Sequence, residues 1–338
     1  MNSAPVPDRC TSCTGSFITF FSGFPGFVYL TIYGGMMTTL QVHELTVSYG
    51  KGKNALDGVS FSIGTGVFGL LGPNGAGKSS LMRTIATLQR PDSGRILFHD
   101  IDVVKSPLEL RKLLGYLPQE FGVYPNMSAE ALLDYCAQLK GIAAQKERAA
   151  AVSRVLDVTN LNDVRKDHAE GFSGGMKQRF GIAQMLLADP QLIIVDEPTA
   201  GLDPSERNRF LGLIRELGQN RTVICSTHIV EDIADLCTTF AILQHGRILA
   251  HTTPAEALAQ FRGRLWSGEI DSMDLPLFRS SHHVLSASSS TMAGRSVLRI
   301  AADNPPSERF QPAEPTLEDI FFSAVNLTEV RSKGERHR

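Results

Sequence analysis

The sequence predicts an α/β fold whose core is a doubly wound, mostly parallel sheet. Continuous apolar runs at 67–71, 192–195 and 223–225 have the length and composition of parallel strands that are buried on both faces. Segments with helical spacing separate these runs, as they do where helices cover both faces of such a sheet. A glycine-rich loop follows the first run, and ligands of these folds bind at the carboxyl ends of the strands. The sequence therefore places a binding site directly after residue 71.

Alternating apolar residues upstream of that loop predict an antiparallel hairpin with a Gly- and Lys-rich turn at 50–53. The alternating residues are Leu45, Val47 and Tyr49, then Val59, Phe61 and Ile63. The helix after the loop is expected to bury one face, made of Leu81, Met82, Ile85 and Leu88. A turn at 91–94 then leads into another short strand at 95–98.

Between about residues 125 and 163 the apolar spacing becomes helical, which predicts a helical insertion in the α/β frame. Its first helix is expected to begin after Ser128, because serine commonly caps helix N-termini. The residues expected to form its two buried stripes are Leu132, Tyr135, Cys136 and Leu139, then Val152, Val155 and Leu156.

A small α+β appendage is predicted for residues 263–338. It contains a strand at 297–300, a Pro-rich linker at 304–315, and a closing helix that begins at Pro315-Thr316. The apolar stripe of this helix is expected to be Leu317, Ile320, Phe321, Ala324 and Val325.

Residues 1–36 are expected to be an extension upstream of the folded unit. Residues 10–43 contain no Asp, Glu, Lys or Arg, but two glycines and a proline within 23–26 interrupt the apolar run and disfavour a spanning helix. Met36 and Met37 immediately precede the first well-patterned strand. The folded unit is therefore expected to begin at residue 37.

The composition is that of a globular chain in a reducing compartment. The 338 residues are 42% hydrophobic and 20% charged, which suffices for one large domain and an appendage. The net charge is −2 and basic residues form no long runs, so no nucleic-acid partner is expected. Five cysteines do not suggest a disulfide framework, and Cys10-x-x-Cys13 lacks a second Cys/His pair for a zinc site.

The loop at 72–79 reads Gly-Pro-Asn-Gly-Ala-Gly-Lys-Ser and fits the pattern G-x-x-x-x-G-K-[ST] at every fixed position. Its glycines let backbone N–H groups face inward as a nest for phosphate oxygens. Lys78 brings a positive charge to the terminal phosphates, and Ser79 offers a hydroxyl to Mg²⁺. An ordinary glycine-rich turn is the alternative, but strand, loop and helix follow in the order that phosphate binding requires. The residues expected to contact the nucleotide here are Gly72, Pro73, Asn74, Gly75, Ala76, Gly77, Lys78, Ser79 and Ser80.

Two carboxylates follow the apolar run 192–195. Asp196 is expected to hold Mg²⁺ directly or through water, and Glu197 to accept a proton from the water that attacks the terminal phosphate. The alternative is a pair of solvated acids at a strand end. The phosphate loop upstream favours the catalytic interpretation.

A helix start at Ser173-Gly174-Gly175 offers a hydroxyl and exposed N–H groups that suit an anion. Taken alone, this feature predicts no more than a helix N-cap without a ligand. Its meaning depends on the other motifs of the chain.

Six features in family order and at family spacings make residues 38–262 resemble the ATP-binding subunit of ABC transporters. They are the loop 72–79, Gln119 after Gly115-Tyr116-Leu117-Pro118, Ser173-Gly174-Gly175, Asp196-Glu197, Asp203 in Gly201-Leu202-Asp203, and His228 in Ser226-Thr227-His228. The resemblance implies a RecA-like phosphate-loop NTPase core with an antiparallel β subdomain and an ABC-specific helical subdomain at about 121–175. The ATP-binding domain would then span 37–262, with 263–338 as an accessory region.

The resemblance also implies a role for each matching position, with ATP and Mg²⁺ as ligands. Tyr49 would stack on adenine, Gln119 would sense Mg²⁺ and the attacking water, and His228 would hydrogen-bond the terminal phosphate. Glu197 would be the general base, as its place after the strand already suggests. Phe172 and Met176 replace the more common Leu and Gln, but neither change removes an anion-binding group, so activity is expected to survive.

Pairing of two copies is a further implication of the resemblance. Ser173, Gly174 and Gly175 would serve the nucleotide of a second subunit, and Asp203 would join the nucleotide-binding residues. A lysine near a phosphate offers about 4 kcal/mol at an effective dielectric of 20, which is too little for a triphosphate. Mg²⁺, loop amides and the partner's helix start would therefore share the task.

Three functional classes are compatible with a phosphate loop: the energising subunit of a membrane exporter, a soluble ABC-type ATPase acting without a permease, and an unrelated phosphate-loop kinase. A phosphate-loop kinase does not require the Ser173 motif or His228, so the kinase is the least favoured class. The tail at 314–321 resembles the ending of drug-resistance exporter ATPases, which favours the exporter. A separate transmembrane permease is then implied, with the chain in the cytoplasm, peripheral to the inner face of the membrane. The sequence does not reveal the cargo.

An apolar cluster next to Gln119 is the expected contact with the permease. Its members are Phe121, Val123, Tyr124 and Pro125. The same residues could equally belong to the core.

Overall fold

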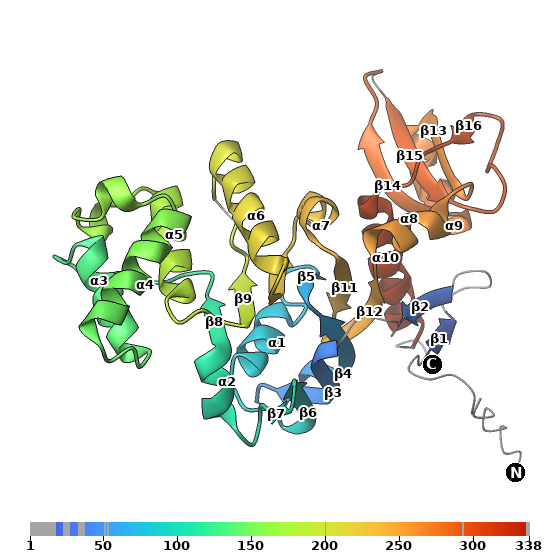
Figure 1. Cartoon of the computed structure of the whole chain (residues 1–338). Helices are drawn as coiled ribbons and strands as arrows, with labels where there is room; N and C mark the ends of the chain where they lie inside the picture. Colours follow the sequence, from blue (N-terminus) through green and yellow to red (C-terminus); the bar gives the residue numbers. More distant parts are fainter. Residues whose placement is uncertain are drawn as a thin grey trace, which may run out of the picture.

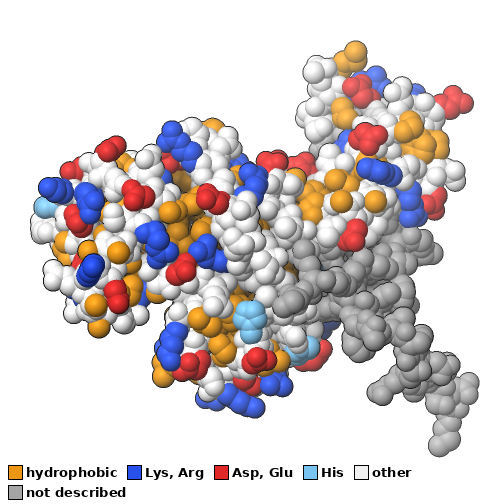
Figure 2. Space-filling view, viewed as in Figure 1, with side chains coloured by type: hydrophobic (Ala, Val, Ile, Leu, Met, Phe, Trp, Pro, Cys, Tyr) orange, Lys and Arg blue, Asp and Glu red, His pale blue; other side chains and the backbone are white. Residues whose placement is uncertain are grey.

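The computed structural model describes residues 18–22, 28–32, 38–50, 52, 54–199, 201–292 and 294–335. The described part has a helical region at one end, a central region of two sheets, and an appendage at the other end (Figure 1). On the face drawn in Figure 2, basic and acidic side chains are interspersed over the helical region and the appendage. None of the helices in the described part of the chain has the length and apolar character needed to cross a bilayer.

The central sheet has six strands in the order β12-β11-β5-β10-β9-β8. Their bounds are β5 Gly66–Leu71, β8 Leu114–Leu117, β9 Leu192–Asp196, β10 Thr222–Thr227, β11 Thr239–Gln244 and β12 Arg247–Thr252. The strands β8, β9, β10, β5 and β11 are parallel, and β12 pairs antiparallel with β11 at the edge. All residues of β9 and β10 are buried, so the predicted parallel strands are confirmed.

Alternate residues of each central strand face two different apolar layers. Val67, Ile193 and Val223 pack with helix α6, Pro204–Gly218, in one cluster. The residues next to them in sequence, such as Phe68 and Ile194, pack in the other cluster with helix α1, Lys78–Ile85, and the antiparallel sheet. This two-sided burial explains why the strands read as continuous apolar runs.

The second sheet is antiparallel, with the order β4-β3-β6-β7. Its strands are β3 Thr38–Ser48, β4 Asn54–Gly64, β6 Ser93–Phe98 and β7 Ile101–Asp102. The predicted hairpin is β3 paired with β4, and the predicted strand at 95–98 lies in β6. Tyr49, the last residue of the predicted alternating pattern, follows the end of β3 and is exposed.

Helix α1 ends earlier than predicted. Ala86 is its C-cap, and Thr87 has φ 61°, a left-handed conformation that does not continue a helix. Leu88 therefore lies beyond the helix and is 60% exposed, so its assignment to the buried face was wrong.

The helical region contains α3 Ala129–Leu139, α4 Gln145–Val158, short 3-10 helices at Asn162–Val164 and Ala169–Gly171, and α5 Gly174–Leu186. Helix α2, Pro107–Leu113, precedes β8 and packs in the central region through Leu110. Ser128 caps α3 as predicted, its Oγ accepting from the N–H of Ala131. The predicted stripe of α3 was partly wrong. Its buried residues are Ala129, Leu132, Leu133 and Ala137. Two alanines and two leucines thus pack in the cluster shared with the neighbouring helices, while Tyr135 and Leu139 are exposed. The stripe of α4 at Val152, Val155 and Leu156 is confirmed.

The appendage follows helix α8, Pro254–Phe261, and is an antiparallel sheet with the order β14-β15-β13-β16. Its elements are β13 Leu265–Asp271, a 3-10 turn at Ser272–Asp274, α9 Leu275–Ser281, β14 His283–Ser289, β15 Arg295–Ala301, β16 Phe310–Pro312 and α10 Leu317–Glu335. The predicted strand at 297–300 and the closing helix are confirmed. The Ser-rich stretch forms β14, and the Pro-rich linker contains β16.

One apolar cluster joins the appendage to the central region. Leu317 and Ile320 of α10 and Leu265 of β13 pack in it with Phe240 of β11. Helix α7, Val230–Leu236, contributes Ile233 to the same cluster. The closing helix therefore packs on its own chain, and in Figure 1 it lies between the sheet of the appendage and the central region.

Two short strands lie within the predicted N-terminal extension. They are β1 Ile18–Ser22 and β2 Val28–Ile32, which pair antiparallel as a separate two-stranded sheet. The rest of residues 1–36, including Cys10 and Cys13, lies outside the described residues. The prediction that residues 1–36 are not part of the fold stays a prediction.

A partly buried ion pair connects α10 to β15 and gives a stability prediction. Arg299 donates to both carboxylate oxygens of Asp319 at 2.7 Å, and Thr316 donates to the same carboxylate from its N–H and its hydroxyl at 2.8 Å. Burial raises the pKa of Asp319, but the hydrogen bonds from Arg299 and Thr316 outweigh it and hold the pKa below its usual value. The pair therefore stabilises the fold above the unfolded-state pKa of about 3.9, and this contribution is lost as the pH falls through the lower folded-state pKa.

Asp319→Asn is expected to lower the free energy of unfolding near pH 7 by about 2 kcal/mol, because it removes a charged acceptor. Urea unfolding at pH 7 measures this loss. The matched control is Asp303→Asn, which breaks a pair with Arg264 in which the Asp303 side chain is 70% exposed. That change should cost less than about 1 kcal/mol, and equal losses for the two variants would contradict the prediction.

Candidate nucleotide-binding site

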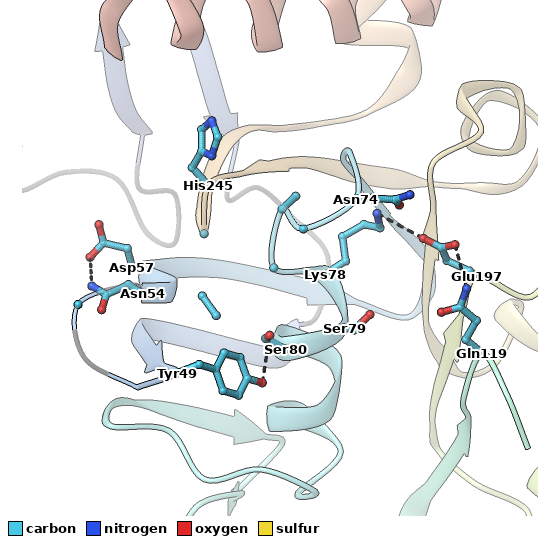
Figure 3. A pocket seen from close by; sticks show the side chains of 16 residues that line it. Tyr49, Asn54, Asp57, Asn74, Lys78, Ser79, Ser80, Gln119, Glu197 and His245 are labelled. Carbon is cyan, nitrogen blue, oxygen red and sulfur yellow. Dashed lines mark hydrogen bonds and ion pairs between the residues drawn. The ribbon is translucent and has the colours of Figure 1, made fainter. Parts of the chain in front are cut away.

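A pocket of about 940 Å³ opens where the phosphate loop meets the antiparallel sheet (Figure 3). Most of the predicted site residues, nucleotide-binding and catalytic, line it. These are Tyr49, Asn74, Gly75, Ala76, Gly77, Lys78, Ser79, Ser80, Gln119 and Glu197. The pocket is large enough for a nucleotide, since ligand pockets usually measure about 300 to 1,000 Å³.

The loop fits between β4 and β11 only because glycines occupy two of its positions. A Cβ on Gly72 would lie 2.3 Å from the carbonyl oxygen of Leu243, and one on Gly77 would lie 2.4 Å from that of Ala55. Gly77 also has φ 110° and is the N-cap of α1, with no side-chain acceptor for the first N–H groups of the helix. Those N–H groups and the helix dipole suit a phosphate.

The ammonium group of Lys78 is buried and held by three oxygens. Its Nζ donates to the carbonyl oxygen of Gly72 at 2.7 Å and to that of Pro73 at 3.3 Å. It also lies 3.4 Å from Oε1 of Glu197, and the Lys78 side chain is only 5% exposed. The Lys78 ammonium group is thus held between the phosphate loop and the predicted general base, Glu197.

Glu197 is the residue on which the predicted catalytic groups converge. Besides Lys78, its carboxylate lies 3.4 Å from Nδ1 of His228 and 3.5 Å from Nε2 of Gln119. These residues follow the ends of β9, β10 and β8, three parallel strands whose carboxyl ends meet. Glu197 has φ 47°, which turns its side chain toward the loop directly after the strand. The side chain is 13% exposed, so a water molecule can reach it.

Asp196 is buried, and its carboxylate accepts a hydrogen bond from Oγ of Ser226 at 2.7 Å. It does not line the pocket, whereas Ser79 and Gln119 do. Together these three residues offer a hydroxyl, an amide and a carboxylate oxygen. Such an oxygen-only donor set fits Mg²⁺.

The helix start at Ser173 and the residue Asp203 do not reach the pocket of their own chain. Oγ of Ser173 accepts from the N–H of Met176 at 3.3 Å, and Ser173 and Gly174 are exposed at the start of α5. Asp203 caps α6 by accepting from the N–H groups of Ser205 and Glu206, and the bond from Glu206 lowers its pKa. Their role toward a second subunit stays a prediction.

Tyr49 lies at the pocket edge with its ring exposed, and its hydroxyl is 3.2 Å from Oγ of Ser80 and 2.5 Å from Oε1 of Gln89. The ring is therefore held beside the loop, within reach of a base. Its stacking on adenine stays a prediction.

Three further pocket residues, at the β11–β12 turn and on β4, were not predicted from the sequence. They are Asn54, Asp57 and His245 (Figure 3). The turn supports the loop, because the N–H of Gly246 donates to the carbonyl oxygen of Ala76 at 2.9 Å. His245 and Gly246 both have positive φ, and a His-Gly dipeptide between two apolar runs was an available hairpin signal.

Comparison with known proteins gives the family. A sequence model described as "ABC transporter" matches residues 56–200. The linearmycin resistance ATP-binding protein LnrL of Bacillus subtilis (strain 168) is 36% identical over 253 residues, which are 72% of this chain and 80% of that protein. The chain belongs to the ATP-binding subunits of ABC transporters. It is an ATPase, as the resemblance implied.

Two further matches are consistent with this ABC transporter assignment. The Nod factor export ATP-binding protein I of Rhizobium etli is 33% identical over 229 residues, which are 67% of this chain and 72% of that protein. The solved structure of cbiO1 from Clostridium perfringens, part of the ABC transporter complex cbiONQ, superposes with a TM-score of 0.61 at 29% identity. That match covers 66% of this chain and 91% of cbiO1, so the predicted phosphate-loop α/β fold is confirmed.

Proposed function

We propose that this ABC ATPase energises export through a separate membrane permease, with two copies of the chain binding Mg-ATP between them. The observation that carries the proposal is the convergence of Lys78, Gln119 and His228 on Glu197, beside a loop suited to phosphate. Relatives named for linearmycin resistance and for Nod factor export support the direction of transport. The chain would act in the cytoplasm, at the inner face of the membrane.

Hydrolysis in this proposal follows from the positions of the chain's own groups. The carboxylate of Glu197 accepts a proton from water as the oxygen of that water attacks the terminal phosphorus. The bond from this phosphorus to the bridging oxygen breaks at the same time, so that ADP leaves and inorganic phosphate is formed. The phosphate oxygens compete with Glu197 and the loop carbonyls for the ammonium of Lys78, which leaves the Glu197 carboxylate free to act as a base. His228 and Gln119 orient the reacting groups. Ser79, Gln119 and Asp196 would hold Mg²⁺, and the bound ion would neutralise charge on the phosphates.

The exposed helix start at Ser173 supports pairing of two copies. Its N–H groups and hydroxyl have no phosphate in their own chain, whereas the phosphates bound by the loop would need additional donors. A partner related by a two-fold axis would supply them twice, once to each nucleotide. ATP would then stabilise the dimer, and its hydrolysis would weaken the dimer.

Gly174→Asp tests this pairing. A Cβ at Gly174 meets no atom within 4 Å, so the substitution leaves the fold intact while placing a negative charge where a partner's phosphate should lie. Light scattering on the purified full chain should give a dimer with Mg-ATP for the wild type and a monomer for the variant. Binding of a fluorescent ATP analogue to the variant should stay within about 3-fold of the wild type, because each monomer keeps its own loop.

Gly212→Asp is the matched control, since a Cβ at Gly212 on α6 also meets no atom within 4 Å. This variant should still dimerise with ATP. A Gly174→Asp chain that pairs as tightly as the wild type would contradict the proposed seam.

The permease would contact the surface beside Gln119. Tyr124 and Pro125 are exposed there, and the ring of Tyr124 packs edge-on against that of Tyr135 at a centroid distance of 5.9 Å. Phe121 and Val123 instead pack against the core of the helical region. The predicted apolar cluster is thus divided, and its exposed half is the proposed contact with a membrane partner.

A further inference from the structure

A buried serine links the two carboxylates of the site. Ser226, near the carboxyl end of β10, is 0% exposed, and the pairing of β10 with β9 places it opposite Asp196. Its Oγ donates to Oδ1 of Asp196 at 2.7 Å and accepts from the N–H of Glu197 at 2.9 Å. A hydroxyl has one proton and two acceptor sites, so it makes both bonds at once.

The bond to Glu197 matters because of the backbone conformation of that residue. Glu197 has φ 47°, a left-handed conformation that is unfavourable for a residue with a Cβ. The bond from its N–H to Ser226 favours this conformation, in which the carboxylate lies near Lys78, Gln119 and His228. Without the bond, the peptide between Asp196 and Glu197 could turn, and the carboxylate would leave its neighbours.

We infer that Ser226 is a positioning residue for ATP hydrolysis, which holds Glu197 in its catalytic orientation through the 196–197 peptide. The inference rests on the proposed role of Glu197 as general base. Ser226 does not line the pocket, so it acts through Glu197 and not on the nucleotide. It should therefore affect the rate of hydrolysis much more than the affinity for ATP.

The same strand offers a matched control for a merely structural role. Thr222 on β10 is also buried, and its hydroxyl lies 2.6 Å from that of Thr39. Within the described part of the chain, the Thr222 hydroxyl is hydrogen-bonded to Thr39 and to the carbonyl oxygen of Gly64, and not to Asp196 or Glu197. Thr222→Val therefore removes a buried hydroxyl of the same strand without disturbing the carboxylates.

The test measures kcat and KM of the full chain by phosphate release, together with the Kd of a fluorescent ATP analogue and the melting temperature. Ser226→Ala should lower kcat by about 10- to 100-fold, with KM and Kd within about 3-fold of the wild type. Ser226→Thr, which keeps the hydroxyl, should recover most of the rate. Thr222→Val should lower the melting temperature but keep kcat within about 2-fold.

A double-variant cycle separates this inference from the proposed function. In a Glu197→Gln background, Ser226→Ala should cost less than about 2-fold, because both residues act at one step. An equal loss in both backgrounds, or a wild-type kcat in Ser226→Ala, would overturn the inference. A wild-type kcat in Glu197→Gln alone would instead overturn the proposed general base.

If Ser226→Ala does not fold, Ser226→Cys preserves the volume while weakening both bonds, and a wild-type kcat there would also overturn the inference.

Discussion

Glu197→Gln is expected to lower the rate of ATP hydrolysis by about 10²- to 10⁴-fold while ATP still binds. Glutamine has the shape of the carboxylate but cannot accept a proton from the attacking water. The loop, Lys78 and Ser79 are unchanged, so affinity for the nucleotide should persist. Because hydrolysis would no longer weaken the seam, the ATP-bound dimer should also last longer. Phosphate release gives the rate, and light scattering gives the dimer.

Glu120→Gln is the matched control, since Glu120 is an exposed acid next to Gln119 and does not line the pocket. Its rate should equal that of the wild type. Unchanged turnover in the Glu197 variant would remove that residue from the role of general base, and a parallel loss of ATP binding would indicate damage to the loop.

Lys78→Met should abolish measurable hydrolysis and raise the Kd for ATP by about 10²-fold or more. The affinity should fall because a buried cation that faces phosphate oxygens contributes about 4 kcal/mol at an effective dielectric of 20. Methionine keeps the volume of the side chain, which limits the damage to packing. The variant also leaves Glu197 without the cation that lies 3.4 Å away. Titration with a fluorescent ATP analogue measures the affinity.

The control for Lys78 is Lys112→Met on α2, where the lysine is 68% exposed and pairs with Glu109. That variant should bind ATP like the wild type. If Lys78→Met bound ATP with wild-type affinity, the loop would not be the phosphate site, and both the proposed function and the inference about Ser226 would lose their basis.

The parts of the site that lie within one short segment could be predicted from the sequence. The loop 72–79 and the pair Asp196-Glu197 each combine a strand, its end and the reactive side chains in a few residues. Burial on both faces made β9 and β10 recognisable as continuous apolar runs. These local patterns were sufficient to place Lys78 and Glu197 in one pocket.

Features that depend on packing between distant segments could not be predicted in the same way. Ser226 meets Asp196 only through the register of β10 on β9, and a single buried serine leaves no periodic signal. The exposure of Leu139 depends on how α3 is rotated against its neighbours, which the helical period does not specify. The early end of α1 arises from the conformation of Thr87, a residue type without a strong preference for it.

The appendage and the central region share one apolar cluster, so each region keeps apolar side chains of the other out of water. Phe240 and Ile233 belong to the central region, yet they are shielded partly by Leu317 and Ile320 of α10. A chain shortened after α8 would leave these side chains facing water and prone to aggregation. Helix α7, which holds Ile233, begins two residues after His228. An exchange of the appendage between relatives would thus have to match the surface of α7, or it would shift His228, which lies beside Glu197.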